Sequence, residues 1–233
     1  MLNVSKRRNY LLTSVAKLDF RKFHFRILTD EDVQESSKLL SKMFHAGEPV
    51  VQHLAQNIGY SFNPEKYVSK GSKQQLSIVC EDVSQPICER ILGVQVCSAL
   101  ELSSSIDKHD YLALTVNHMM LEWIRLHPEL KFEELSEKVF HLDFVATKAG
   151  FENYGIATKL IMESLNHAKQ KGFQIAMLEA SGYKTQKIFG EKLKFKEMNS
   201  IVYDEFEIDG RRVFKGLKSP PKLIVYEMYL DSI

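Results

Sequence analysis

Two neighbouring stretches decide the fold of this chain, DFVAT at residues 143–147 and ENYGIAT at residues 152–158. The first belongs to an apolar run over residues 139–145 that is typical of a buried strand, and the second leads into a helical pattern that begins at Ile156. The first turn of a helix leaves backbone N–H groups without partners, and these groups carry partial positive charge. The unit therefore predicts an anion site, suited to a phosphate, where Gly155 opens the helix.

The same periodicities place the other elements. The expected strands are residues 23–28, 75–81, 91–100, 139–145, 173–179, 198–208 and 223–230, and the expected later helices are residues 110–127, 153–172 and 183–193. An earlier helix opens at the capping box Thr29–Asp32 and stops at Gly47-Glu48-Pro49, before a polar connection that reaches Ser72. This order predicts an α/β protein with a mixed sheet. We expect one domain over residues 23–233, after a basic N-terminal extension over residues 1–22.

Bulk composition places the chain among ordinary globular proteins, with 44% hydrophobic and 26% charged residues over 233 positions. Its formal net charge of +1, from 31 basic and 30 acidic residues, gives no electrostatic footprint for nucleic acid. No apolar run approaches the roughly 20 residues that a membrane-spanning helix needs, so no membrane partner is expected. We expect a cytoplasmic protein, monomeric or weakly dimeric. The basic residues 1–22 leave a mitochondrial location as the alternative.

The anion site does not fit the two commonest phosphate motifs. No Walker lysine and serine follow a pair of glycines, and no GxGxxG precedes an acidic residue at the end of the next strand. Nucleotide hydrolysis and dinucleotide redox chemistry are therefore disfavoured. A lone glycine between strand and helix can also do no more than join two packed elements, so the assignment depends on support from elsewhere in the chain.

That support comes from a family resemblance. The run Glu152-Asn153-Tyr154-Gly155-Ile156-Ala157 resembles the acetyl-coenzyme A motif Q/R-x-x-G-x-G/A of the GNAT acetyltransferase superfamily, and residues 180–189 resemble its second motif. The resemblance covers nearly the whole chain from Phe23 onward. It implies the GNAT fold, a mixed, mostly antiparallel sheet with helices on both faces and a V-shaped splay at the acetyl-coenzyme A strand.

Within the superfamily the chain is most similar to the insect-type arylalkylamine N-acetyltransferases. The features that carry this likeness are Glu48-Pro49 after the first helix, Ser181 and Thr185 in the second motif, and the tail Gly210–Phe214 before the last strand. The implied activity is transfer of acetyl from acetyl-coenzyme A to a small primary amine such as dopamine, serotonin or tyramine.

The resemblance also implies which residues bind acetyl-coenzyme A. The pantetheine arm would lie on the strand edge, the pyrophosphate on the helix start, and Thr185 would contact the coenzyme. The residues assigned to the strand edge are Phe144, Val145, Ala146 and Thr147, and those assigned to the pyrophosphate cradle are Glu152, Asn153, Tyr154, Gly155, Ile156, Ala157 and Thr158. The chain departs from the family pattern at Glu152, where Gln or Arg is usual, at Phe189 in place of a tyrosine, at an inserted Gly190 and at Lys194 in place of a glycine.

The implied chemistry is direct attack of the amine on the thioester in a ternary complex, which needs a proton acceptor because alkylamines are mostly protonated at neutral pH. Glu48 resembles the family's base, and Ser181 and Thr185 match its hydroxyl positions. From the residues alone, an exposed side chain at a helix end is the favoured interpretation of Glu48, and Ser181 could be an ordinary cap. His45, Glu48 and His53 lack the spacing of a zinc site, so no metal is expected.

Two other functions stay open at this stage. Acetylation of a protein lysine or N-terminus would need an open groove for a peptide. A non-catalytic acyl-coenzyme A-binding module is suggested by Glu152, Phe189 and Lys194. The helix expected at residues 110–127 carries Trp123 and other apolar residues, and periodicity alone cannot tell whether they fill the core or roof a pocket for an aromatic amine.

Overall fold

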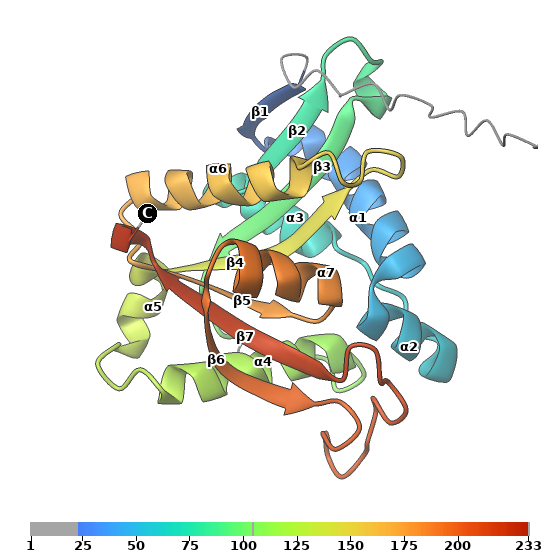
Figure 1. Cartoon of the computed structure of the whole chain (residues 1–233), viewed down its shortest axis with the longest axis vertical. Helices are drawn as coiled ribbons and strands as arrows, with labels where there is room; N and C mark the ends of the chain where they lie inside the picture. The colour runs from blue at the N-terminus through green and yellow to red at the C-terminus, as the bar shows by residue number, and fades with distance from the viewer. Residues whose placement is uncertain (1–22, 104, 233) are drawn as a thin grey trace, which may run out of the picture.

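The computed structural model describes residues 23–103 and 105–232, and the N-terminal extension expected over residues 1–22 lies outside them. The strands of this part of the chain form one seven-stranded sheet in the order β1-β2-β3-β4-β5-β7-β6 (Figure 1). They are β1 (Phe23–Ile27), β2 (Ile78–Asp82), β3 (Ile91–Ala99), β4 (Val139–Thr147), β5 (Ile175–Ala180), β6 (Lys196–Val202) and β7 (Lys222–Tyr229). Neighbours are antiparallel except β4 and β5, which run parallel. The mixed, mostly antiparallel sheet is as predicted.

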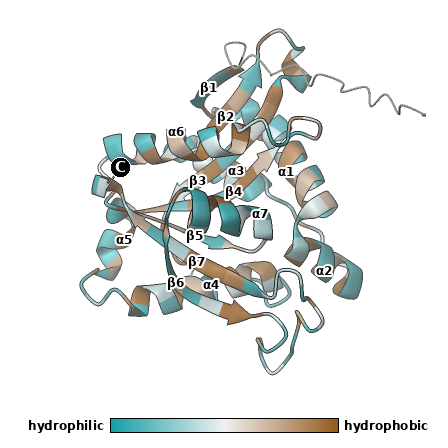
Figure 2. Cartoon of the chain, in the orientation of Figure 1, coloured by the Kyte–Doolittle hydropathy of each residue, from teal (hydrophilic) through white to brown (hydrophobic). Residues whose placement is uncertain are grey.

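Helices cover both faces of the sheet. They are α1 (Val33–Gly47), α2 (Pro49–Ile58), α3 (Glu65–Gln74), α4 (Tyr111–Arg125), α5 (Leu135–Lys138), α6 (Ile156–Gln170) and α7 (Tyr183–Gln186), followed by a π-helical turn, Lys187–Lys192. Side chains alternate between the faces along a strand, so Ile78 of β2 packs with Leu160 of α6, while its neighbour Val79 packs with Leu40 of α1 and Val68 of α3. Figure 2 shows hydrophobic residues along the strands and a mainly hydrophilic α7.

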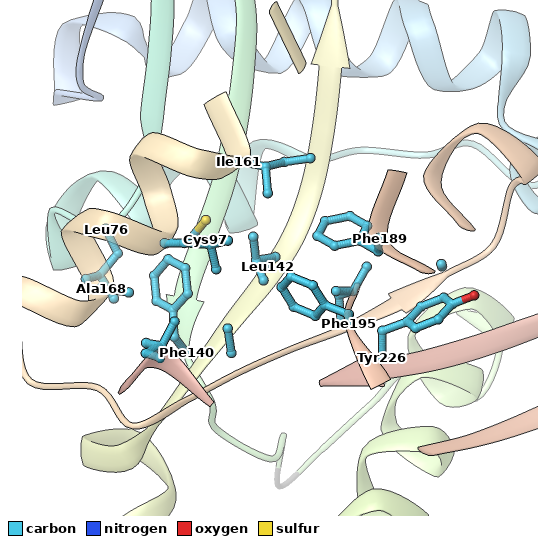
Figure 3. Close-up of a cluster of buried hydrophobic side chains, with 14 of the residues drawn as sticks. Leu76, Cys97, Phe140, Leu142, Ile161, Ala168, Phe189, Phe195 and Tyr226 are labelled. Atoms are coloured by element: carbon cyan, nitrogen blue, oxygen red, sulfur yellow. The ribbon is translucent and has the colours of Figure 1, made fainter. Parts of the chain in front are cut away.

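The core on the α6 face is drawn in Figure 3. It joins Phe140 and Leu142 of β4 to Ile161 of α6 and to Phe189 and Phe195 around the π-helical turn, and all five side chains are buried. The rings of Phe189 and Phe195 meet edge to face at 5.0 Å between centroids. Fully burying an apolar side chain of this size contributes about 1.5–3 kcal/mol to the stability of the folded state. This packing holds α6 and the π-helical turn, which carry parts of the two motifs, against the sheet.

The opposite face holds α4 against β5 and β7. Trp123 of α4 is fully buried, and its indole nitrogen donates to Glu227 at 2.9 Å. His127, one turn further on, also contacts Glu227 at 2.9 Å. Trp123 therefore fills the core and does not form the roof of a pocket for an aromatic amine, the alternative that periodicity had left open.

Strands β4 and β5 pair over only a short length and then separate. β4 pairs with β3 from Phe140 to Thr147, but its pairing with β5 stops at His141, opposite Met177. An additional residue of β4, Asp143, bulges between the partners of Val96 and Cys97 in β3. Such a bulge bends a strand and increases its twist. The predicted V-shaped splay is thus present, and it leaves one edge of β4 without a neighbouring strand.

Two local expectations were wrong, and a third was correct only in outline. The polar connection after Pro49 contains α2 and α3, because Pro49 takes the first helical position, where a missing N–H costs nothing, instead of only ending α1. The strand expected over residues 198–208 ends at Val202. The helix over residues 183–193 is present, but its second half is a π-helical turn, which accommodates the additional residue Gly190.

No helix within the described residues is long and apolar enough to cross a membrane.

Candidate active site

A cavity of about 1390 Å³ opens where β4 and β5 separate. Its walls come from the splayed ends of both strands, the start of α6, the junction of α1 and α2, one side of α4 and the π-helical turn. The two sequence motifs therefore face the same space as Glu48. This is so although Glu48 precedes the first motif by about a hundred residues in the chain. The predicted coenzyme residues that line the cavity are Phe144, Val145, Ala146, Thr147, Glu152, Asn153, Gly155, Ile156, Ala157, Thr158 and Thr185, whereas Tyr154 does not line it.

The start of α6 has no cap from its own side chains. Gly155 is the N-cap, with a left-handed φ of 84°, and no side chain accepts from the first N–H groups of the helix. Asn153 also has a positive φ, 66°, a conformation that asparagine tolerates better than most residues. Lys192 brings a positive charge to the same place, since its ammonium donates to the hydroxyl of Thr158 at 3.1 Å. Free N–H groups beside a lysine form a setting that suits an anion.

The carboxylate of Glu152, the acidic residue that differs from the motif, is hydrogen-bonded within the loop before the helix. It accepts a hydrogen bond from the backbone N–H of Gly150 at 2.7 Å, within the loop that precedes the helix. The side chain is exposed, so solvent screens its charge. The loop therefore gives this carboxylate a partner of its own.

The free edge of β4 supplies a second kind of contact. Beyond His141, the backbone from Leu142 to Thr147 pairs with β3 on one side only, and no described strand pairs with the other side. An extended, apolar arm with amide groups can complete such an edge in the way that an added strand does. Gly93 of β3 lies behind this region, and a Cβ there would come within 3.0 Å of Ile156, so α6 packs closely on the sheet at this point.

Glu48 is the N-cap of α2 and one of its oxygens is shielded from solvent. Oε2 accepts from the backbone N–H of Val51 at 2.5 Å, whereas Oε1 has no hydrogen-bond partner among the described residues. Burial raises the pKa of Glu48 above its usual value, and this outweighs the lowering by the nearby Ser181 hydroxyl and by backbone N–H groups. A carboxyl with a raised pKa is better matched to accepting a proton near neutral pH.

Ser181 and Thr185 line the cavity from the β5–α7 loop and from α7. Ser181 follows β5 directly, and a Cβ on the next residue, Gly182, would be 3.5 Å from the Pro49 ring, so the β5–α7 loop touches the start of α2. Tyr203 closes this junction by donating to the Ser181 carbonyl at 3.2 Å. Ser181, Thr185 and Glu48 all line the cavity.

Sequence reasoning missed a buried charged cluster on the same wall. His141 of β4 lies between two carboxylates, with Nδ1 2.9 Å from Asp143 and Nε2 2.8 Å from Glu179 of β5. Burial by itself lowers the pKa of His141, but the charges and hydrogen bonds of the two carboxylates raise it to about 10. The available signal was the presence of three polar residues inside runs that were otherwise expected to be buried strands.

Phe189 and Lys194, two further departures from the family pattern, have structural explanations. Phe189 is buried in the core, and its ring has no group that could protonate a thiolate. Tyr183, the other phenol considered for that role, is exposed at the cavity rim. Lys194 adopts a left-handed φ of 60°, the conformation for which a glycine would be expected.

In the described part of the chain no group of three or more His, Cys, Asp or Glu side chains is arranged to hold a metal ion.

Comparison with known proteins finds similarity in structure but not in sequence. No family model matches the sequence, and no curated protein matches it. A mosquito arylalkylamine N-acetyltransferase like 5b superposes with a TM-score of 0.71 at 15% identity, over 89% of this chain and 99% of that one. Arylalkylamine N-acetyltransferase 2 from Aedes aegypti gives 0.67 at 18% identity, over 89% and 99% of the two chains. The C-terminal condensation domain of Ebony, in complex with beta-alanyl-dopamine, gives 0.68 at 19%, with the same coverage.

Proposed function

We propose that this chain, which has the fold of the GNAT acetyltransferases, transfers an acetyl group from acetyl-coenzyme A to a small primary amine. The observation that carries the proposal is the meeting of three features in one cavity: the free edge of β4, the uncapped start of α6 and the shielded carboxylate of Glu48. Acetyl-coenzyme A supplies an activated acyl group as its thioester. Each of the three features corresponds to one need of that reaction.

The residues present fit the coenzyme. The backbone from Leu142 to Thr147 offers amide groups for a pantetheine arm, and the first N–H groups of α6 offer donors for a pyrophosphate. Lys192 adds a charge that would stabilise the phosphates. Main-chain groups make most of these contacts, which is why the motif tolerates a side chain such as Glu152.

Glu48 is proposed to accept the proton that the amine loses. The nitrogen lone pair then forms the C–N bond and the C–S bond breaks. The second proton that the nitrogen loses passes to the departing sulfur through water or a hydroxyl such as Thr185. A thiol pKa near 8.5 makes the thiolate a fair leaving group without a dedicated acid, so Phe189 is no obstacle to the reaction. Ser181, beside Glu48, would relay the proton or hold the amine in place.

The lining of the acceptor side supports an amine with an apolar or aromatic body. Leu112, Val116 and Met120 of α4 line the cavity, as do Phe44 and Tyr67. This apolar lining favours a small amine with an apolar body over a protein lysine or N-terminus. An arylalkylamine is therefore the acceptor class that we propose.

The test is release of free thiol from acetyl-coenzyme A by the purified protein across a panel of phenylethylamine, tyramine, dopamine, serotonin and agmatine. The expected result is amine-dependent turnover that is fastest with the aromatic amines. Coenzyme A binding in calorimetry without turnover for any amine would instead support the binding-module alternative. Turnover with peptides but not with small amines would support protein acetylation.

A further inference from the structure

A buried charged cluster of His141, Asp143 and Glu179 forms part of the cavity wall, and the proposed chemistry does not use it. The side chains are 4%, 9% and 6% exposed. Both ring nitrogens of His141 face carboxylate oxygens, which accept hydrogen bonds but donate none when ionised. Each nitrogen must therefore carry a hydrogen, so the ring is an imidazolium held between two carboxylates.

One carboxylate oxygen of this cluster is left without a partner. Asp143 is satisfied at both oxygens, by His141 and by the Ser98 hydroxyl at 2.9 Å. Glu179 uses Oε2 for His141, while its Oε1 is shielded from solvent and has no hydrogen-bond partner in the described chain. The cluster thus holds one imidazolium against two carboxylates, a net charge of −1. A buried carboxylate oxygen without a hydrogen-bond partner destabilises the folded protein unless a ligand satisfies it.

Glu179 lies near the end of β5, two residues before Ser181 in the chain, and both residues line the cavity. Ser181 in turn lies beside Glu48. Two carboxylates, each with a shielded and unpartnered oxygen, therefore face one space.

Two of the lysines that line the cavity are already paired with carboxylates. Lys66 is 3.7 Å from Asp110, and Lys70 is 3.0 Å from Glu101. The other lysines that line the cavity belong to α7 and the π-helical turn, on the proposed coenzyme side. A cation supplied by a ligand is thus the partner that fits the free oxygen.

We propose that Glu179 binds the acceptor as its ammonium ion, through an N–H donated to Oε1, and so selects cationic over neutral acceptors. This assignment rests on the proposed amine acetylation and adds to it the residue that recognises the charge. The two carboxylates then have different roles. Glu48, which has no cationic partner among the described residues, accepts the proton, and Glu179, fixed by the His141 imidazolium, remains the anion that holds the substrate.

The kinetic test compares Glu179→Gln with Glu227→Gln. Glutamine keeps the size of the side chain, and His141 keeps Asp143. Glu227 is a matched control, because it is also a buried strand glutamate that contacts a histidine, but it does not line the cavity. Loss of a hydrogen bond to a charged group corresponds to about a 10- to 100-fold change in affinity. We expect Glu179→Gln to raise KM for phenylethylamine by that factor and to leave KM for acetyl-coenzyme A within about two-fold, and Glu227→Gln to change neither.

A binding test separates this proposal from the proposed reaction. Calorimetry on the protein saturated with coenzyme A compares phenylethylamine with 2-phenylethanol, its neutral isostere. The wild-type complex should prefer the amine, and Glu179→Gln should reduce that preference at least about 10-fold. An unchanged amine-to-alcohol ratio in Glu179→Gln, an equal loss in Glu227→Gln, or no amine binding by the wild type would each overturn the assignment. Amine binding that depends on Glu179 without any turnover would refute the proposed reaction alone.

Discussion

Replacement of Glu48 by glutamine separates two roles that the structure gives to one side chain. The carboxylate caps α2 through the N–H of Val51 and, as we propose, accepts the proton of the amine. Glutamine has a carbonyl oxygen that can keep the cap, but it cannot take up a proton at neutral pH. Alanine removes both functions. The pair Glu48→Gln and Glu48→Ala therefore measures base catalysis and capping independently.

The expected magnitudes differ between the two measurements. General-base catalysis contributes typically about 10²- to 10⁴-fold, so both variants should lower kcat by that factor at saturating amine and acetyl-coenzyme A. Loss of a capping side chain costs about 0.5–2 kcal/mol, which should reduce Tm by about 2–4 °C per kcal/mol in a chain of this size. Only Glu48→Ala should show this loss relative to Glu48→Gln.

The raised pKa of Glu48 fixes the sign of a pH effect on stability. Because burial raises the folded-state pKa above the unfolded value, the folded state binds the proton more readily, and stability falls as pH rises through the folded pKa. Glu48→Gln has no such charge to bury. It should therefore be at least as stable as the wild type at neutral pH, a result measurable by thermal unfolding at about pH 5 and pH 8.

The kinetic and thermal results together can refute this reasoning. In the wild type, kcat/KM should fall on the acidic side with an apparent pKa above that of an ordinary glutamate, and this limb should disappear in Glu48→Gln. A glutamine variant with wild-type kcat would exclude Glu48 as the base. A glutamine variant that unfolds earlier than the alanine variant would show that the carboxylate is chiefly structural.

Three further predictions concern the coenzyme side and the buried cluster. Gly155→Ala should raise KM for acetyl-coenzyme A about 10-fold or more, because a Cβ at a φ of 84° strains the helix start by about 1–2 kcal/mol, whereas Gly59→Ala, at a φ of 69° away from the cavity, should lower Tm similarly without changing KM. Lys192→Ala should raise the same KM about 3- to 10-fold, with an effect that shrinks at high salt. The pKa of His141, raised to about 10, implies stability that is complete below the unfolded value of 6.5 and is lost as pH rises toward 10. An NMR titration in which this ring loses its proton below about pH 8 would contradict it.

Much of the fold could be predicted because most of its elements carry a strong period. The apolar pattern of a buried strand extends over the whole of β3 and β4, and the helical apolar period extends over α6. The order of these elements in the chain then limits the possible topologies. Helices α2 and α3 were not predicted, because the sequence of each also fits a non-helical segment. Pro49 is both a stop for α1 and a favoured start for α2, and α3 is so polar that only three of its ten residues are buried. Tertiary packing, rather than pattern, decides such segments.

The candidate site could be predicted only where a local motif carries it. The helix start at Gly155 and most residues of the second motif line the cavity, since strand, loop and helix are contiguous in the chain. Placing Glu48 there depended on a family resemblance, because about a hundred residues lie between. The cluster of His141 and Glu179 was missed, since nothing in a single sequence says that two polar residues in separate strands face each other.

The separation of β4 from β5 explains why both halves of the site lie together. Paired strands would satisfy the β4 backbone beyond His141 and would close the space that Glu179 faces, so a continuous sheet would leave no edge for a pantetheine arm and no room for an amine. The bulge at Asp143 bends β4 away at the point where the pairing stops. The imidazolium of His141 bridges the two strands at this fork, joined to Asp143 on one and Glu179 on the other. The same ion pair that holds the strands together at the apex therefore also places the carboxylate for the acceptor. A variant that removed the ring of His141 should loosen the fork and affect coenzyme and amine together, whereas Glu179→Gln, whose amide oxygen can still accept the hydrogen bond from His141, should affect the amine alone.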